Sequence, residues 1–361
     1  MPHSENGVFP NAEEVDADWL SQQLQANGID ATVCAFTAEP VGTGQIGKCY
    51  RYHLNYAGPT QGPATLIAKF PSDDPASRAT GVILRNFLKE VKFYQSLQSR
   101  LTIRTPKCYF AEIEGQGPEF LVLMEDLSPG KQGNQLLGCN RQVAQAAVNQ
   151  LIGLHVPSWC DESLKSQAWL YDAQSAKTDA LFEMYKAQLP GFLDRFGPKL
   201  AKDERNIIAR LGESHTAPLY SDLPDMFSLV HVDYRLDNLM IDHRQAGPNI
   251  TVVDWQSITL GAPLSDVAYF IGAGLLADAR RDAEEGIVHG YHEGLLAAGI
   301  EDFDWSTCWN AYRRGAFAGF GVTVIASMMV ARTERGDKMF TAMAQRHARH
   351  ALDLGADEFL A

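Results

Sequence analysis

The chain has 361 residues, and its cysteines are not closely spaced in pairs. It contains no CxxC pair and no Cys/His spacing that could build a zinc site. The six scattered cysteines are Cys34, Cys49, Cys108, Cys139, Cys160 and Cys308. We therefore expect buried, reduced thiols rather than a disulfide framework or a zinc centre.

Positive charge is also scarce. Lys and Arg number 31 against 44 Asp and Glu, which gives a formal net charge of −13. Non-specific binding to nucleic acid or to an anionic membrane requires a basic surface. The composition therefore disfavours both partners, although acidity alone does not imply a cationic substrate.

Targeting signals and a clear membrane segment are missing as well. The N-terminal stretch MPHSENGVFPNAEEVDADWL is acidic and has no apolar region typical of a signal peptide, so we expect a cytoplasmic protein. One uncharged run, GAFAGFGVTVIASMMVA, lies between Arg314 and Arg332 at the lower edge of the ~17–25 residues that span a bilayer. Its three glycines, its Thr and its Ser favour a buried helix instead.

The sequence pattern changes near Asp126. Before it, β-prone runs such as GKCYRYHLNY and ATLIAKF alternate with Gly- and Pro-containing turns, and a long helical pattern covers residues 80–101. After it, the pattern is mainly helical. We therefore predict an α+β chain with a small N-terminal lobe, residues 1–126, that holds an antiparallel sheet and one long helix, and a larger helical lobe, residues 127–361.

A glycine-rich stretch, VGTGQIGKCYR, places Gly42, Gly44 and Gly47 in a GxGxxG arrangement. A dinucleotide-binding fold would need a helix after these glycines, but Tyr50 and Tyr52 alternate as in a strand. This context favours a flexible hairpin whose backbone N–H groups lie over phosphates. An ordinary glycine-rich hairpin remains the alternative.

Lys69 is a lone cation at the end of the apolar run TLIAKF. A buried lysine requires an anionic partner, because an unpaired charge in the interior costs several kcal/mol. Glu90, in the helical run LRNFLKEVKFYQSL, is one candidate partner and a bound phosphate is another. The alternative is a surface lysine whose aliphatic stem lies along apolar side chains.

The stretch LVHVDYRLDNLMID holds an HxDxxxxN pattern made by His231, Asp233 and Asn238, and Asp254 follows in ITVVDWQ. Phosphoryl transfer uses this set of groups: an Asp orients the attacking hydroxyl, while an amide and a second carboxylate hold Mg²⁺. The alternative is a capped turn with an incidental ion pair between Asp233 and Arg235. The order of glycine-rich hairpin, strand Lys, helix Glu, HxDxxxxN and Asp is typical of protein-kinase-like folds.

With these motifs the chain resembles the aminoglycoside phosphotransferase and choline kinase group, including its ecdysteroid-kinase-like branch, over roughly residues 40 to 340. The most specific stretches are HVDYRLDN, VVDWQ and GAPLSDVAYF. The resemblance implies a two-lobed protein-kinase-like fold and a small-molecule kinase that uses ATP and Mg²⁺. It also implies Asp233 as catalytic base or hydroxyl-orienting group, Asn238 and Asp254 as Mg²⁺ ligands, and Arg235 as a γ-phosphate contact.

The resemblance further implies the remaining nucleotide contacts. Lys69 would contact the α- and β-phosphates and pair with Glu90. In the stretch LMEDL, the backbone carbonyl of Glu125 and the amide of Leu127 would hold adenine. His231 and Asp266 would fix the catalytic loop rather than react.

The chain departs from the family pattern at Val232, where many relatives have Gly, and in DWQ, which replaces the DFG of protein kinases. Only eleven residues separate Asp254 from Asp266, too few for an activation loop, so the spacing favours a small-molecule hydroxyl acceptor over a peptide. Aromatic residues in the helical lobe favour a bulky, partly apolar alcohol. A cationic acceptor and a catalytically silent nucleotide-binding scaffold remain alternatives, and the sequence does not indicate an oligomeric state.

Overall fold

The computed structural model describes residues 11–42, 46–171, 180–214, 223–244 and 247–360. Two compact units can be distinguished and are described separately. The first comprises Met1–Arg100, Thr105–Ser128 and Asp254–Gln256, and the second comprises Leu101–Arg104, Pro129–Val253 and Ser257–Ala361. The lobe boundary at Asp126 stays a prediction.

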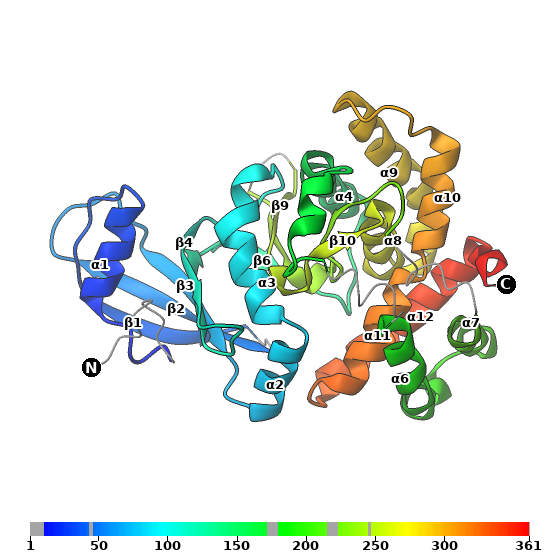
Figure 1. Cartoon of the computed structure of the whole chain (residues 1–361), viewed down its shortest axis with the longest axis horizontal. Helices are drawn as coiled ribbons and strands as arrows, with labels where there is room; N and C mark the ends of the chain where they lie inside the picture. The colour runs from blue at the N-terminus through cyan, green and yellow to red at the C-terminus, as the bar shows by residue number, and fades with distance from the viewer. Residues whose placement is uncertain (1–10, 43–45, 172–179, 215–222, 245–246, 361) are drawn as a thin grey trace. The chain divides into compact units, whose positions relative to one another are not determined.

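The first unit is built on a five-stranded sheet in the order β1-β2-β3-β5-β4, with every neighbouring pair antiparallel (Figure 1). Its strands are β1 Val33–Val41, β2 Gly47–Tyr56, β3 Thr65–Pro71, β4 Cys108–Ile113 and β5 Phe120–Glu125. Helix α1, Ala17–Ala26, begins after Asp16, whose carboxylate accepts a hydrogen bond from the Trp19 backbone N–H at 2.7 Å. Trp19 and Leu20 pack with the apolar side chains of the sheet and so cover it.

The long helical pattern predicted over residues 80–101 is interrupted near its start. The segment consists of α2 Pro75–Ile83, α3 Asn86–Lys92, a π-helical turn Phe93–Leu97 and a 3₁₀ turn Gln98–Arg100. The break falls at Arg85, whose φ of 57° is left-handed. There the Phe87 ring packs directly on Gly81, where a Cβ atom would lie 2.4 Å from the ring. Because the Phe87 ring packs on Gly81 across the break, side-chain packing separates α2 from α3 despite the continuous helical pattern.

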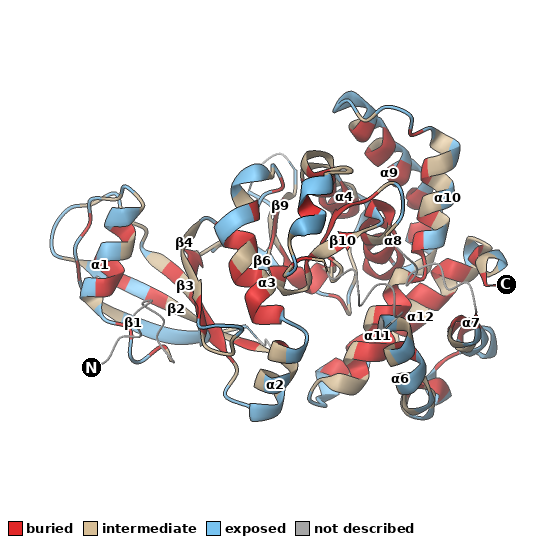
Figure 2. Cartoon of the chain, viewed as in Figure 1, coloured by how far each residue is buried: buried red, intermediate tan, exposed pale blue. Residues whose placement is uncertain are grey.

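The second unit is mainly helical, and α8 forms its buried centre (Figure 2). Its helices are α4 Arg141–His155, α6 Ala180–Phe196, α7 Lys202–Glu213, α8 Pro263–Gly274, α9 Ala277–Ala297, α10 Trp305–Gly315, α11 Ala318–Met329 and α12 Glu334–Asp353. The short strands β6 Lys131–Gln132, β8 Leu239–Asp242 and β9 Asn249–Val252 form one antiparallel sheet, and β7 Ser228–Val230 pairs with β10 Thr259–Gly261. Short 3₁₀ turns cover Val156–Ser158, Glu162–Ser166, Gly197–Lys199, Leu236–Asn238 and Ala356–Phe359, and a further one, Trp255–Ser257, begins in the first unit.

The uncharged run near the C-terminus forms α11, most of which is buried against other helices of the second unit. Over the part of the chain that the structure describes, no helix combines the length and the apolar character needed to cross a bilayer. The six cysteines are all free, as predicted, but their predicted burial is complete only for Cys308, and Cys34 is exposed.

Candidate active site

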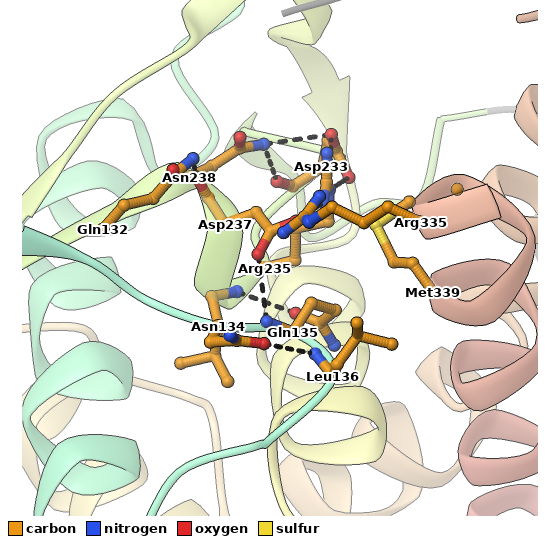
Figure 3. Close-up of polar contacts among 12 residues, drawn as sticks. Gln132, Asn134, Gln135, Leu136, Asp233, Arg235, Asp237, Asn238, Arg335 and Met339 are labelled. Atoms are coloured by element: carbon orange, nitrogen blue, oxygen red, sulfur yellow. Dashed lines mark hydrogen bonds and ion pairs between the residues drawn. The ribbon is translucent and has the colours of Figure 1, made fainter. Parts of the chain in front are cut away.

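The loop between β7 and β8 holds Asp233 in a set of hydrogen bonds. Arg235 Nε donates to both carboxylate oxygens, at 3.0 and 3.1 Å, and Asn238 Nδ2 donates to Oδ2 at 3.0 Å (Figure 3). The Tyr269 hydroxyl, from α8, donates to Oδ1 at 2.8 Å. Three donors therefore fix the orientation of a carboxylate whose side chain stays 19% exposed.

Arg235 links Asp233 to a second carboxylate. Its Nη1 donates to Asp237 Oδ2 at 2.9 Å, and Arg335 Nη2, from α12, donates to the same oxygen at 3.0 Å (Figure 3). Burial acts to lower the pKa of Arg235, but the carboxylates of Asp233 and Asp237 more than offset this effect and raise it. The ion pair between Asp233 and Arg235, expected as an alternative to a catalytic site, is thus present as part of a larger charged network.

The segment before α4 supports this loop from below. Gln135 donates its backbone N–H to Asp237 Oδ1 at 2.9 Å, and its side-chain oxygen accepts from the Leu236 backbone N–H at 2.9 Å (Figure 3). Its amide nitrogen donates to the Ala273 carbonyl at 2.9 Å, at the end of α8. Sequence reasoning missed Gln135, because it lies about a hundred positions from the loop and no local pattern distinguishes it.

Asp266, in the first turn of α8, binds the start of the loop through backbone groups. Its carboxylate accepts from the N–H of His231 at 2.6 Å and from that of Val232 at 2.9 Å. The buried His155 lies behind it, with Nε2 3.6 Å from the same carboxylate. The His231 ring is within 3.1 Å of the Val253 carbonyl. These contacts place Asp266 and His231 where they can hold the loop, and their supporting role stays a prediction.

The position of Val232 requires an unusual backbone conformation. Its φ is 72°, in the left-handed region, which costs a β-branched residue about 1–2 kcal/mol. We expect Val232→Gly to raise the free energy of unfolding by up to about 1 kcal/mol, since the larger unfolded-state entropy of Gly cancels part of the relief. Denaturant unfolding measures the change.

The matched control for this substitution is Val230→Gly, in β7, where the valine is buried and the strand backbone is ordinary. Loss of that side chain should lower the free energy of unfolding by more than about 2 kcal/mol. Equal losses in the two variants would contradict the assignment of strain to Val232.

In the first unit, Lys69 is buried and paired with two carboxylates. Its Nζ lies 2.6 Å from Glu90 Oε2 and 2.8 Å from Asp254 Oδ1. Burial acts to lower the pKa of Lys69, but Asp254 and Glu90 more than offset this effect and raise it, so the ammonium stays charged. The alternative of a surface lysine is therefore wrong.

The DWQ segment is anchored to α3 and to the π-helical turn that follows it in the same unit. The Trp255 ring stacks on Phe93 with centroids 3.9 Å apart and planes 4° apart, and Asn86 Nδ2 donates to the Gln256 carbonyl at 3.0 Å. Asp254 itself has a left-handed φ of 69° and accepts from Gln256 Nε2 at 3.1 Å. These contacts fix the backbone of the DWQ segment.

Lys69→Met should be strongly destabilising, because Glu90 is 1% exposed and burial already raises its pKa to about 7, so that without the lysine it must either take up a proton or remain as an unpaired buried charge. We expect the free energy of unfolding to fall by about 3–5 kcal/mol, and the double variant Lys69→Met/Glu90→Gln to recover part of that loss. Lys48→Met is the control, since Lys48 also makes a 2.6 Å ion pair, but with Asp73 at the surface. That pair should contribute no more than about 1 kcal/mol. Similar losses for the two lysines would show that the Lys69 pair is not a buried one.

Two of the three predicted glycines can be placed. Gly42 has a φ of 78° at the end of β1, a conformation that suits Gly, and Gly47 begins β2. A Cβ atom at Gly47 would lie 3.1 Å from both the Lys69 side chain and the Phe70 carbonyl. Gly44 lies outside the described residues. Gly47 is thus packed against β3, the strand that carries Lys69.

The predicted adenine-binding segment follows β5. Glu125 is the last residue of that strand, and Leu127 comes two positions later. Between them, the Asp126 carboxylate accepts from Arg51 Nε, on β2, at 2.6 Å and from the Ser128 N–H at 3.0 Å. These contacts hold the segment to the sheet, while its contact with adenine stays a prediction.

Solved structures with the same architecture define the class of fold. An aminopropanol kinase associated with a microcompartment aligns with a TM-score of 0.55 at 14% identity, over 95% of this chain and 99% of its own. A choline kinase from Cryptosporidium parvum aligns with a TM-score of 0.51 at 9% identity, over 89% of each chain. The predicted α+β, two-lobed protein-kinase-like fold is therefore confirmed.

The chain belongs to the ecdysteroid kinase-like family, whose sequence profile matches residues 42–300. This family membership confirms the predicted resemblance to the ecdysteroid-kinase-like branch. A curated relative, the uncharacterized oxidoreductase dhs-27 of Caenorhabditis elegans, is 25% identical over 251 residues. That match covers 64% of this chain and spans only 30% of the length of the relative.

Proposed function

We propose that this chain transfers the γ-phosphoryl group of ATP, bound with Mg²⁺, to a hydroxyl group of a small molecule. The observation that carries the proposal is the Asp233 carboxylate, oriented by three donors within 3.1 Å and still accessible. A carboxylate held in this way can receive the hydrogen bond of an incoming hydroxyl without reorganising.

The residues predicted to hold the nucleotide and the metal have suitable chemistry. Mg²⁺ prefers oxygen ligands, and Asn238 and Asp254 supply an amide oxygen and a carboxylate. The amide nitrogen of Asn238 is used by Asp233, which leaves the oxygen of that amide for a cation. The backbone carbonyl of Asn238 accepts from the backbone N–H of Val253, at 3.0 Å, and Asp254 is the next residue in the chain. Lys69 would contact the α- and β-phosphates.

The proposed reaction needs no covalent enzyme intermediate. The acceptor hydroxyl would donate to Asp233, its oxygen would form the new bond to the γ-phosphorus, and its proton would pass to the carboxylate. The bond from the γ-phosphorus to the bridging oxygen would break and ADP would leave. Mg²⁺, when bound, would neutralise charge on the phosphate oxygens, and the Arg235 guanidinium beside Asp233 would add to that effect.

For the acceptor we propose a bulky, partly apolar alcohol rather than a polycation. The guanidinium groups of Arg235 and Arg335 both pair with carboxylates of the catalytic loop, so the loop presents no excess of negative charge. Several aromatic residues of the helical lobe are buried packing residues, namely Tyr185, Phe192, Phe196, Phe303 and Tyr312. Trp169, Tyr171, Phe182, Trp305 and Trp309 are partly exposed and remain candidates for an acceptor site.

Release of ADP by the purified protein, measured across a panel of hydroxyl compounds, tests this proposal. The panel should contain sterols, hydroxy acids, choline and aminoglycosides, with Mg-ATP as donor and the Asp233→Asn variant as control. Transfer to an apolar alcohol that the variant does not catalyse would support both parts. Transfer to choline or an aminoglycoside would support the kinase and overturn the acceptor class. Tight nucleotide binding without Asp233-dependent ADP release would instead indicate a silent scaffold.

A further inference from the structure

A stacked pair of buried rings lies behind Asp233. Tyr269, on α8, is 1% exposed and donates its hydroxyl to Asp233 Oδ1 at 2.8 Å. The ring of His347, on α12, lies against the Tyr269 ring with centroids 5.1 Å apart and planes 25° apart. His347 is fully buried. Tyr269 therefore lies between the His347 ring of α12 and the Asp233 carboxylate.

Two glycines make room for this imidazole. A Cβ atom at Gly319, on α11, would lie 2.2 Å from both Cε1 and Nδ1 of the His347 ring. A Cβ atom at Gly272, on α8, would lie 3.0 Å from His347 Nδ1 and 2.5 Å from His350 Nδ1. The His347 ring therefore rests on the backbones of α8 and α11, and any larger residue at either position would displace it.

Both rings keep one protonation state at neutral pH. Burial lowers the pKa of His347 to about 3, and the neighbouring His350 and Arg346 act in the same direction, so the imidazole is neutral. Burial and the Asp233 carboxylate raise the pKa of Tyr269 well above its usual value, so the hydroxyl keeps its proton. The hydroxyl can therefore only donate to Asp233, and the stack carries no charge.

A histidine at position 347 lowers the stability of the fold if packing is its only role. Within the described part of the chain neither of its buried ring nitrogens has a hydrogen-bond partner. Burying unpaired polar nitrogens lowers stability, and an aliphatic side chain would avoid this loss. What an aliphatic residue cannot supply is a flat face that fixes the plane of the Tyr269 ring.

We propose that Tyr269 and His347 are positioning residues for Asp233. His347 fixes the phenol ring by stacking, and the hydroxyl fixes one carboxylate oxygen, so that Asp233 meets the acceptor hydroxyl in a single orientation. This inference rests on the proposed phosphotransferase function. Misplacing a reacting group by about 1 Å can cost up to roughly a hundredfold in rate, so we expect kcat to be affected and nucleotide binding to be spared.

Steady-state kinetics and thermal unfolding of four variants test the proposal. Tyr269→Phe removes one hydroxyl and should lower kcat about tenfold or more, with the KM for nucleotide unchanged. His347→Leu removes the flat face and should lower kcat similarly, whereas His347→Phe keeps it and should retain most activity. The control is Tyr185→Phe, in which a buried tyrosine loses its 2.9 Å bond to the Ile208 carbonyl. It should match Tyr269→Phe in Tm but keep the wild-type kcat.

A wild-type kcat in Tyr269→Phe would overturn the proposal, as would equal kcat in the Leu and Phe variants of His347. If the wild-type protein transfers no phosphoryl group to any acceptor, the proposed function fails, and a different readout decides the positioning role. The Tm losses of Tyr269→Phe and Asp233→Asn are then compared with that of the double variant. A double loss smaller than the sum would support a direct coupling, and additive losses would refute it.

Discussion

Asp233→Asn should lower kcat by about 10²–10⁴-fold, the range expected when a positioned base is lost. The asparagine keeps the size of the side chain, and its oxygen can still accept from Arg235 or Tyr269. It cannot receive the proton of the acceptor hydroxyl, and its own NH₂ group would face one of the present donors. Nucleotide affinity should persist, because Lys69 and Glu90 are untouched. Turnover measured as ADP release and affinity measured by calorimetry separate the two effects.

The control for this variant is Asp203→Asn. Asp203, in the first turn of α7, is also ion-paired with an arginine, Arg349, but at the protein surface. Loss of that pair should leave kcat within experimental error of wild type. Turnover of Asp233→Asn close to that of Asp203→Asn would remove Asp233 from the mechanism.

Asp254→Asn should weaken the binding of Mg-nucleotide by at least about 10–100-fold. Substitution of a residue that only hydrogen-bonds a metal ligand already causes a loss of about this size. A carboxylate proposed as a metal ligand would be replaced by a neutral amide. Lys69 would also lose one of its two carboxylates, although Glu90 would keep it paired and the fold intact. Titration of turnover with Mg²⁺ at fixed ATP measures the change as a higher half-saturating concentration.

Asp242→Asn is the matched control for the metal variant. Asp242 ends β8 and pairs with Arg244, so it is a carboxylate of the same type away from the proposed ligands. Its Mg²⁺ dependence should equal that of wild type. A folded Asp254→Asn variant with the same Mg²⁺ dependence would exclude Asp254 as a metal ligand.

Much of the fold could be predicted because its signals are local. The strands alternate in polarity and are separated by Gly and Pro turns, so the antiparallel sheet of the first unit follows from short windows of sequence. The break at Arg85 could not be predicted in this way. It depends on the Phe87 ring packing on Gly81 and stacking on Phe120, about thirty residues further along the chain. Periodicity alone contains no information about such a contact.

The residues of the candidate site also fall into two groups, those with a local sequence signal and those without one. Asp233, Asn238 and Asp254 could be found because phosphoryl transfer requires these groups within one loop and the next strand. Tyr269 left a signal that was not used, since it lies three positions after Asp266 and so shares a helix face with it. His347 left none, because its place behind Tyr269 is set by the packing of three helices from distant parts of the chain.

The proposed phosphotransferase activity is tested most directly by following the phosphoryl group itself. The wild-type protein and Asp233→Asn are incubated with Mg²⁺, an acceptor from the panel and ATP that carries ¹⁸O in its γ-phosphate, and the acceptor is then examined by mass spectrometry. We expect a labelled phosphoryl group on the acceptor hydroxyl with the wild-type protein and almost none with the variant. Labelled inorganic phosphate with no labelled acceptor, or equal labelling by both proteins, would contradict it.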